Sequence, residues 1–185
     1  MKIIIGSGKT TIDGWISTQE TELNVLCRSD FERISQHGKI SAMLAEHVWE
    51  HMTNEEGILA AKNCYDYLED GGYLRVAVPD RNFRNEWYQN LVKAGGNGDP
   101  SHPASTHKIV YDNISFREVF ERAGFVVDLL EYCDAEGNFH YKYWNEADGM
   151  IGRSYRFDTR NNADHLGMVS IILDAKKPVI IHHGK

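Results

Sequence analysis

The sequence predicts an α/β fold with a mixed, mostly parallel sheet, helices on both faces and an antiparallel C-terminal strand. One observation behind this prediction is that short apolar, β-branched segments alternate with amphipathic helical segments, as in parallel sheets covered by helices. Another is that the last two apolar segments, 125–132 and 168–175, have no helical pattern between them. We therefore expect those two strands to pair antiparallel.

The first strand is expected at Lys2–Ile5, because this run is apolar and β-branched and ends at a glycine-rich turn over residues 6–8. Short strands are also predicted at 15–18 and 23–26 from their apolar content. A helix over 83–92 is predicted in the middle of the chain, before a long polar loop.

Three helices are expected to begin at capping boxes, in which two side chains three residues apart each bind a backbone N–H. The pairs with this spacing are Ser29 with Glu32, Thr53 with Glu56, and Ser115 with Glu118. Helices often end at a glycine, because glycine adopts the left-handed backbone conformation at little cost. A glycine follows each of the three predicted helices. The glycines expected to end the three helices are Gly38, Gly71 and Gly124. The side chains expected to face the core are Phe31, Ile34, Ile58, Ala61, Cys64, Tyr65, Leu68, Phe116, Val119 and Phe120.

Ile40–Ala45 and Tyr73–Val78 are predicted to be buried parallel strands on either side of the second helix, which makes a right-handed βαβ unit. A polar cluster, residues 46–51, follows the first of these strands. In open α/β sheets, ligands bind at the carboxyl ends of the strands. This cluster is therefore a candidate site.

The length predicts a single domain over residues 1–176, with irregular insertions near 81–107 and 133–165. Loops of this length inside a compact domain are usually functional or disordered. Residues 177–185 are expected to form a C-terminal tail, in which Val179–Ile181 is a candidate edge strand.

The composition excludes several classes of protein. The 185 residues carry 20 basic and 27 acidic side chains, and this net charge of −7 disfavours non-specific binding to nucleic acid or to anionic membranes. Cys27, Cys64 and Cys133 are widely spaced and odd in number, which argues against a disulfide framework and a CxxC metal pair. The N-terminal apolar run is too short for a signal peptide, and no run is long enough for a transmembrane helix, so we expect a cytoplasmic protein.

The run of residues 47–51 matches the HxxEH pattern of inverted zinc hydrolases. On a helix, His47 and His51 would share one face and could hold zinc, with Glu50 as general base. The run directly follows a strand, however, and no third ligand stands out. The alternative is that its apolar residues pack inward while its polar residues line a loop, and we assign no metal ligand.

Four further residues are candidates for substrate chemistry. His107 follows the loop expected at 95–106, and its unperturbed pKa suits proton transfer near neutral pH. Arg153, Arg156 and Arg160 recur at spacings of three and four, and could bind an anionic substrate through forked hydrogen bonds. The alternative for these arginines is a solvated basic patch paired with nearby aspartates.

Motifs spread along the chain resemble those of the class I S-adenosylmethionine (SAM)-dependent methyltransferases, and more closely those of a compact group of predicted methyltransferases. The resemblance covers most of the chain and implies a Rossmann-like fold. The motifs, in order, are Gly6-Ser7-Gly8 with Asp13-Gly14-Trp15, Ala45–His51 after the fourth predicted strand, Leu68–Asp80, and Ala123-Gly124-Phe125 before the sixth.

The resemblance also implies which residues contact the cofactor. Gly6, Ser7 and Gly8 would pass close to the methionine and ribose of SAM. Glu46 and His47 would lie beside its methionine or its sulfonium.

At other positions the chain departs from the family pattern. An acidic residue that ends the second strand binds the ribose hydroxyls in the family, and the matching position here is Gln19, followed by Glu20. Many such enzymes also carry an acid two residues before the first glycine, where this chain has Ile4. Asp30 is expected near the adenine amino group.

The resemblance implies SAM-dependent methyl transfer to a small-molecule or glycan-type acceptor, with a homodimer as the candidate assembly. Methyl transfer is an in-line displacement in which positioning supplies much of the acceleration. A general base is needed only for a protonated acceptor, and His47, His51 and His107 are the candidates. The alternatives are a non-catalytic descendant that binds a nucleoside or a partner protein, suggested by Gln19 and Ile4, and, less favoured, a zinc hydrolase.

Overall fold

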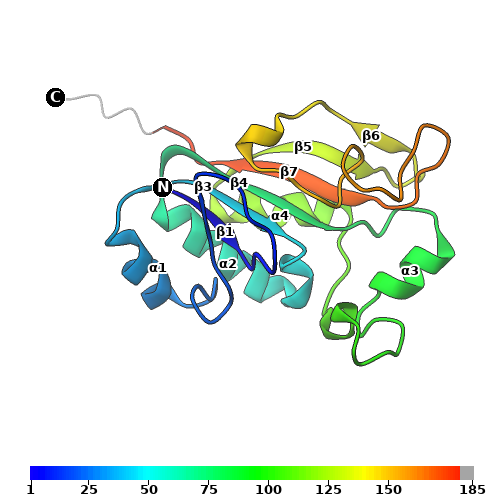
Figure 1. Ribbon diagram of the computed structural model, residues 1–185, viewed down its shortest axis with the longest axis horizontal. Coiled ribbons are helices and arrows are strands. Elements are labelled where there is room, and N and C mark those ends of the chain that lie inside the picture. Colours follow the sequence, from blue (N-terminus) through cyan, green and yellow to red (C-terminus); the bar gives the residue numbers. More distant parts are fainter. Residues whose placement is uncertain (180–185) are drawn as a thin grey trace.

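The computed structural model describes residues 1–179 and is built on one sheet of seven strands (Figure 1). The strand order across the sheet is β2-β1-β3-β4-β7-β5-β6. The strands are β1 (Lys2–Ile5), β2 (Trp15–Ser17), β3 (Ile40–Glu46), β4 (Leu68–Pro79), β5 (Val126–Cys133), β6 (Phe139–Tyr141) and β7 (Ser170–Lys176).

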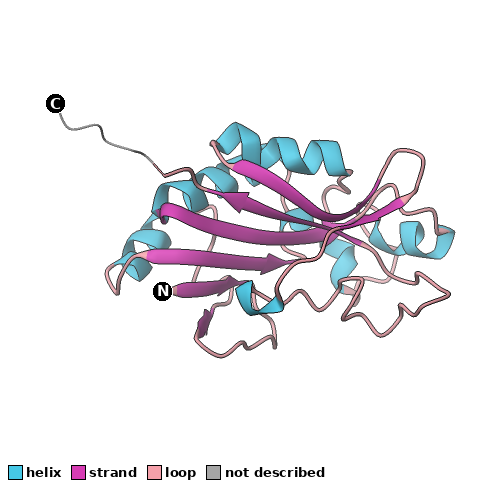
Figure 2. Cartoon of the chain, turned by 90° about the horizontal axis from the view of Figure 1, so that it is seen from above, coloured by secondary structure: helices cyan, strands magenta, loops and turns pink. Residues whose placement is uncertain are grey.

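The sheet is mixed, as the sequence predicts. β2, β1, β3 and β4 pair parallel to one another, whereas β7 pairs antiparallel with both β4 and β5. β5 therefore runs in the same direction as β1 to β4, and only β6 and β7 oppose them. Figure 2 shows β7 lying between β4 and β5, so the last strand joins the two halves of the sheet. The predicted class and the antiparallel C-terminal strand are confirmed.

Three of the four α-helices cover one face of the sheet (Figure 1). The α-helices are α1 (Arg28–Ser35), α2 (Asn54–Tyr67), α3 (Glu86–Val92) and α4 (Asn113–Ala123), and short 3₁₀ helices occupy Trp49–His51, Pro103–Thr106 and Glu146–Asp148. Because side chains alternate along a strand, Ile3 and Ile5 of β1 pack against this helical layer while Ile4 faces the other side. Phe31, Cys64 and Phe116 join them from α1, α2 and α4.

The second face is covered by the irregular segment 142–169 instead of the predicted second layer of helices. Trp144 and Ile151 of this segment pack on Ile4 and Leu44 of the sheet. The guanidinium of Arg75 holds the segment in place, because its Nη1 donates to the carbonyls of Asn145 and Gly149 at 2.9 and 2.8 Å. Backbone groups that a helix would satisfy internally are satisfied here by a buried side chain.

The strand predicted at 23–26 is wrong. Leu23 and Val25 are buried as expected, but the segment is a turn, since its polar groups bind locally. The amide oxygen of Asn24 accepts from the N–H of Leu26 at 2.9 Å, and the N–H of Asn24 donates to Asp30 at 3.0 Å. Asparagine competes with ladder pairing in this way. The strand that the resemblance counts as fourth is therefore the third, β3.

One of the three predicted capping boxes forms as expected. At α2, Thr53 Oγ1 accepts from the N–H of Glu56, and the carboxylate of Glu56 accepts from the N–H of Thr53. α1 begins at Arg28, before Ser29, without a side-chain cap, so the box predicted there is wrong. α4 begins earlier than predicted, with a box between Asp112 and Ser115.

The stop predicted for α2 is also wrong, because the helix ends at Tyr67 and β4 begins at Leu68. Gly71 lies in β4 with a φ of +79°, where the pairing with β3 shifts register. This backbone belongs to an irregularity in the ladder and not to a helix cap. Gly124, by contrast, ends α4 in the left-handed conformation, as predicted.

The C-terminal tail begins inside the fold. Lys177 Nζ donates to the carbonyls of Tyr65 and Leu68 at 2.9 and 2.7 Å, which fixes the first tail residue to the end of α2. Val179 is exposed and lies outside the strands. The rest of the predicted edge strand lies outside the described residues.

Two expectations from composition can be compared with residues 1–179. No helix in this range has both the length and the apolar character needed to cross a bilayer. Cys27, Cys64 and Cys133 are all free thiols, as predicted. Cys133 is fully buried in an apolar cluster, and burial raises the pKa of its thiol to about 12.

The buried ion pair between β4 and β7 yields a first prediction. Arg75 Nε and Nη2 bind the two oxygens of Asp174 at 2.7 and 3.0 Å, and both residues are buried. Arg75→Gln leaves a buried carboxylate unpaired and should lower the free energy of unfolding by about 3–5 kcal/mol. Urea denaturation measures this, with Arg117→Gln at an exposed pair as the control, expected below about 1 kcal/mol. Equal effects in both variants would contradict the role of Arg75.

Asp80, at the end of β4, yields a prediction on pH. Burial raises its pKa from 3.8 to about 6, against the hydrogen bonds that its oxygens accept from the N–H groups of Asn82 and Cys133. The folded state therefore binds a proton more tightly than the unfolded state, and this contribution to stability is lost as pH rises through about 6.

The matching variant is Asp80→Asn, which cannot titrate. The free energy of unfolding of the wild type minus that of the variant should fall by roughly 2–2.5 kcal/mol between pH 4 and pH 7. Denaturation at a series of pH values gives both curves. A difference that stays constant with pH, or that rises, would show that Asp80 is not the group responsible.

Candidate ligand-binding site

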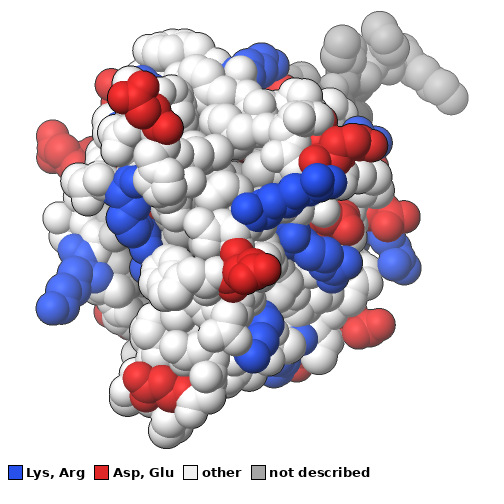
Figure 3. Space-filling model, turned by 90° about the vertical axis from the view of Figure 1, so that its right-hand side faces the viewer, with Lys and Arg blue, Asp and Glu red and all other residues white. Residues whose placement is uncertain are grey.

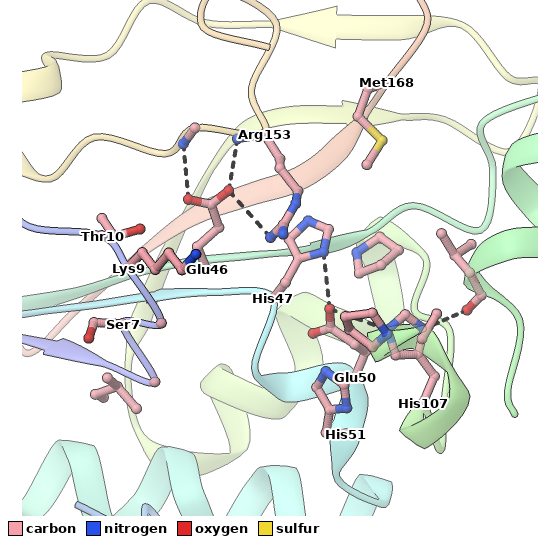
Figure 4. Close-up of a pocket in the computed structure, with 18 of the residues that line it drawn as sticks. Ser7, Lys9, Thr10, Glu46, His47, Glu50, His51, His107, Arg153 and Met168 are labelled. Carbon is pink, nitrogen blue, oxygen red and sulfur yellow. Dashed lines mark hydrogen bonds and ion pairs between the residues drawn. The ribbon is translucent and has the colours of Figure 1, made fainter. Parts of the chain in front are cut away.

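The carboxyl ends of β1, β3 and β4 open into a cavity of about 650 Å³, the position where α/β sheets bind ligands. The turn after β1 forms one wall and the polar cluster after β3 forms the floor. The loop that carries His102 and His107 closes a third side. Figure 4 shows Ser7, Glu46, His47 and Glu50 around this space, each drawn from the end of a strand or the turn that follows it.

The turn after β1 has a backbone that favours glycine. Gly6 and Gly8 have φ values of +58° and +56°. A Cβ at Gly6 would lie 3.0 Å from Val48 Cγ2, whereas a Cβ at Gly8 would meet nothing within 4 Å. The Gln19 amide donates to Ser7 Oγ at 3.0 Å and to the Gly8 carbonyl at 2.9 Å. The Gln19 side chain thus stabilises this turn, and the space next to Gly8 is open.

The chain leaves β3 through a turn centred on His47. This residue has a φ of +56°, the one positive φ outside glycine among the described residues. Its N–H donates to the carbonyl of Ala77 at 2.8 Å, and its Nε2 lies 3.0 Å from Ser170 Oγ. Its Nδ1 lies 3.2 Å from Oε1 of Glu50. A histidine tolerates this backbone better than a β-branched residue would.

Glu46, the last residue of β3, faces the cavity but is committed to the irregular segment above the sheet. Its two oxygens accept hydrogen bonds from the N–H groups of Gly152 and Arg153 at 3.0 and 2.8 Å (Figure 4). Glu46 therefore anchors the segment that covers this part of the cavity. Its place beside the methionine of a cofactor stays a prediction.

The HxxEH segment does not form the helix on which a zinc hydrolase signature depends. Residues 49–51 are a single 3₁₀ turn, and His47 precedes it in the left-handed conformation. The fold instead brings Glu50 and His51 together with His107 from the distant loop, with one ligand atom of each within 4.8 Å of the others. His51 and His107 pack edge to face, with ring centroids 4.9 Å apart.

The charge state of this cluster follows from its burial. Burial opposes ionisation of Glu50, but the imidazole of His47 outweighs this and holds the pKa of the carboxyl below its usual range. Burial lowers the pKa of His107, against the carbonyl of Val92 that binds its Nδ1–H. His107 is therefore neutral at pH 7 and able to accept a proton.

A second cavity of about 320 Å³ lies on the other side of the β1 turn. Leu23, Val25 and Leu26, from the turn that replaces the predicted strand, form its apolar wall together with Met52. Glu20 lies at its rim. The two cavities share Ile5, Gly6, His47 and His51, so they meet between the β1 turn and the end of β3.

The predicted ribose and adenine residues take different positions relative to this second cavity. Gln19 is turned toward the β1 turn, which its side chain braces, while Glu20 next to it lines the cavity. Asp30 lies outside the walls of both cavities, and its carboxylate accepts the N–H of Asn24 and faces Arg33. Glu56 also lines this cavity, but its carboxylate already accepts from the N–H of Thr53 and from Nζ of Lys108, which leaves Glu20 as the acid free to meet a ligand.

Two of the three predicted arginines line the larger cavity. Arg160 forms a two-bond pair with Asp158 at 2.8 and 2.6 Å, and Arg153 Nη1 lies 3.6 Å from Glu46. Arg156 instead stacks on Trp144, 4.7 Å from its ring centroid, and serves packing. Basic and acidic side chains are interspersed over this end of the molecule (Figure 3).

Sequence reasoning missed the apolar wall at Leu23–Leu26 as part of a site, because its apolar run predicts a strand. It also missed Gly152, whose N–H binds Glu46 from over a hundred residues away. Lys9 and Thr10 line the larger cavity directly after the glycine turn, and their position next to Gly8 was the available signal.

The anchoring role of Glu46 yields a prediction. Glu46→Ala removes the acceptor of two backbone N–H groups, so the amides of Gly152 and Arg153 should exchange with solvent at least about tenfold faster, the effect of losing roughly 1.4 kcal/mol. Hydrogen exchange by NMR measures this at each amide. Glu118→Ala, on the exposed face of α4, is the matched control. Unchanged exchange at both amides would contradict the assignment.

No family model matches the chain, and no curated protein is similar to it in sequence. Solved structures share its architecture at low identity. A SAM-dependent methyltransferase from Archaeoglobus fulgidus matches with a TM-score of 0.52 and 13% identity, over 95% of this chain and 85% of its own. An O-methyltransferase family protein from Burkholderia thailandensis matches with a TM-score of 0.50 and 10% identity, over 89% of this chain and 36% of its own.

Human N-acetylserotonin methyltransferase, solved in complex with SAM, matches with a TM-score of 0.50 and 8% identity, over 96% of this chain. The match covers 40% of the human chain, so this protein spans well under half the length of the human and Burkholderia relatives. At such identities the similarity concerns the fold. The chain has the fold of the class I SAM-dependent methyltransferases.

Proposed function

We propose that this protein transfers a methyl group from SAM to a small-molecule or glycan-type acceptor. One observation carries the proposal: two cavities of different character meet at the glycine turn after β1, at the carboxyl ends of the strands. The smaller one has an apolar wall with Glu20, Glu56 and Lys108 around it, and the larger one is lined by more polar and charged side chains. A cofactor with an adenosyl part and a charged part needs both.

The residues present fit SAM. Leu23, Val25 and Met52 would enclose the adenine, and Glu20 is the acid available to bind the ribose hydroxyls. The open space above Gly8 would accept the methionine part against the backbone of the turn. When bound, SAM supplies an electrophilic methyl group on a sulfonium.

The larger cavity would hold the acceptor. Lys9, Arg153 and Arg160 line it, and they would favour an acceptor with anionic or many hydroxyl groups. His107 is neutral because burial lowers its pKa, and it lies in the wall as the best candidate to take a proton from an acceptor hydroxyl. His47 is less free for this role, since Ser170 and Glu50 flank both of its ring nitrogens.

A non-catalytic descendant that binds a nucleoside is the second candidate. The observation that favours it is that Gln19 and Glu46, two of the expected cofactor-contacting side chains, are spent on internal hydrogen bonds. It predicts binding of nucleosides in the smaller cavity without methyl transfer to any acceptor. Turnover with a panel of hydroxylated and anionic acceptors would exclude it.

Calorimetry with SAM and S-adenosylhomocysteine tests the proposal. Both should bind with one site per chain, and Glu20→Gln should weaken binding by about tenfold, since it removes a charge-assisted hydrogen bond worth roughly 1.5 kcal/mol. Glu118→Gln, exposed on α4, should leave binding unchanged. If the folded protein binds neither compound at millimolar concentration, the proposal is wrong.

A further inference from the structure

Three hydrogen-bond acceptors converge in the wall of the larger cavity. They are the carboxylate of Glu50 and one ring nitrogen each of His51 and His107, all within 4.8 Å of one another. Figure 4 shows these side chains grouped below the cavity, reaching it from the turn after β3 and from the loop before α4. Mutual repulsion of acceptor lone pairs makes such a group unfavourable unless a proton or a metal cation lies between them.

The tautomer of His107 is fixed by its surroundings. Its Nδ1 lies 2.8 Å from the carbonyl oxygen of Val92, which can only accept, so Nδ1 carries the hydrogen. The lone pair of the neutral ring is then on Nε2. That nitrogen lies 3.9 Å from Oε1 of Glu50.

The tautomer of His51 is fixed in the same way. The hydroxyl of Thr106 donates to the carbonyl of Pro103 at 3.0 Å, so it accepts from Nδ1–H of His51 at 2.8 Å. The Nε2 of His51 is left as an acceptor. Histidines that bind metals characteristically donate their other ring N–H to an oxygen in this manner.

Glu50 is the independent observation that points to a ligand. Its side chain is fully buried, at 0% exposure, and within residues 1–179 neither carboxylate oxygen accepts a hydrogen bond. Its one close ion-pair contact is with Nδ1 of His47, 3.2 Å from Oε1, which leaves Oε2 without a partner among these residues. Buried carboxylates are normally paired or coordinate a metal, because an unsatisfied one is costly.

We propose that Glu50, His51 and His107 bind a divalent first-row transition metal ion, with an open coordination position toward the larger cavity. Two neutral imidazoles and one carboxylate are a ligand set that suits Zn²⁺, and also Fe²⁺. Ligands of a tetrahedral Zn²⁺ lie about 3.4 Å apart, so the side chains close in by roughly 1 Å on binding. Glu50 is a ligand in this site, not the general base of a zinc hydrolase. Because Nε2 of His107 is also a ligand, His107 can take a proton from an acceptor only in the metal-free protein.

The experiment uses the full chain without an affinity tag and with His182→Ala and His183→Ala, which remove two adjacent histidines of the tail. Metal-free protein is titrated with Zn²⁺ against a chelating indicator, and with Co²⁺ while its visible absorption is recorded. One equivalent should bind, and Co²⁺ should show the intense bands of four-coordinate nitrogen and oxygen ligation. Zn²⁺ should also raise the thermal midpoint.

Variants locate the site. Glu50→Gln and His107→Ala should each weaken Zn²⁺ binding by at least about 100-fold, and Thr106→Val, which removes only the support of His51, by about 10- to 100-fold. His37→Ala removes a histidine far from the cluster and should leave the affinity unchanged. Circular dichroism of each metal-free variant confirms that it is folded.

The proposal is overturned if the folded wild type binds no equivalent of Zn²⁺ or Co²⁺, or if binding persists unchanged in the folded Thr106→Val and His107→Ala proteins. If Glu50→Gln does not fold, Thr106→Val and the Co²⁺ spectrum of the wild type still decide. Binding of S-adenosylhomocysteine to the metal-free protein is measured separately by calorimetry. A failure to bind metal is therefore distinguishable from a failure to bind the cofactor.

Discussion

The left-handed turn at His47 is the constraint on which the site depends. Placing a residue other than glycine in this conformation costs about 1–2 kcal/mol, and the cost is offset by the hydrogen bond from its N–H to Ala77 and by the position of its ring between Ser170 and Glu50. The turn stops β3 sharply. It leaves Glu46 on the side of the irregular segment and carries Glu50 to the opposite side, under the loop of His107. If β3 continued straight past Glu46, then Glu46 and Glu50 would not lie on opposite sides of the turn.

The second face of the sheet shows how a layer can be built without helices. Charged side chains of the sheet take the place of internal helical hydrogen bonds: Arg75 binds two carbonyls of the covering segment, and Glu131 accepts from Trp144 Nε1 and from the N–H of Tyr155. Burial raises the pKa of Glu131, against the two hydrogen bonds that it accepts. Because each of these buried polar groups bonds to a defined partner, they fix the position of the covering segment on the sheet.

Alternation of apolar strands with amphipathic helices was sufficient to predict the α/β class, the βαβ unit and the antiparallel β7. Side chains that bind nearby backbone groups were harder to predict. The Asn24 amide makes a turn where a strand is predicted, and Asp112, not Ser115, caps α4. At the site, the glycine turn and the HxxEH run could be found as local patterns. The meeting of Glu50 with His107, and of Glu46 with Gly152, depends on tertiary contacts between distant segments, which no local spacing encodes.

The place of β7 in the strand order has a consequence for how the chain is made. β7 fills the gap between β4 and β5, so the β2-β1-β3-β4 half of the sheet and the β5–β6 hairpin cannot join into one sheet until β7 has been synthesised. Before that point the edges of β4 and β5 that face β7 have no strand to pair with, and unpaired strand edges are sites where chains misassemble.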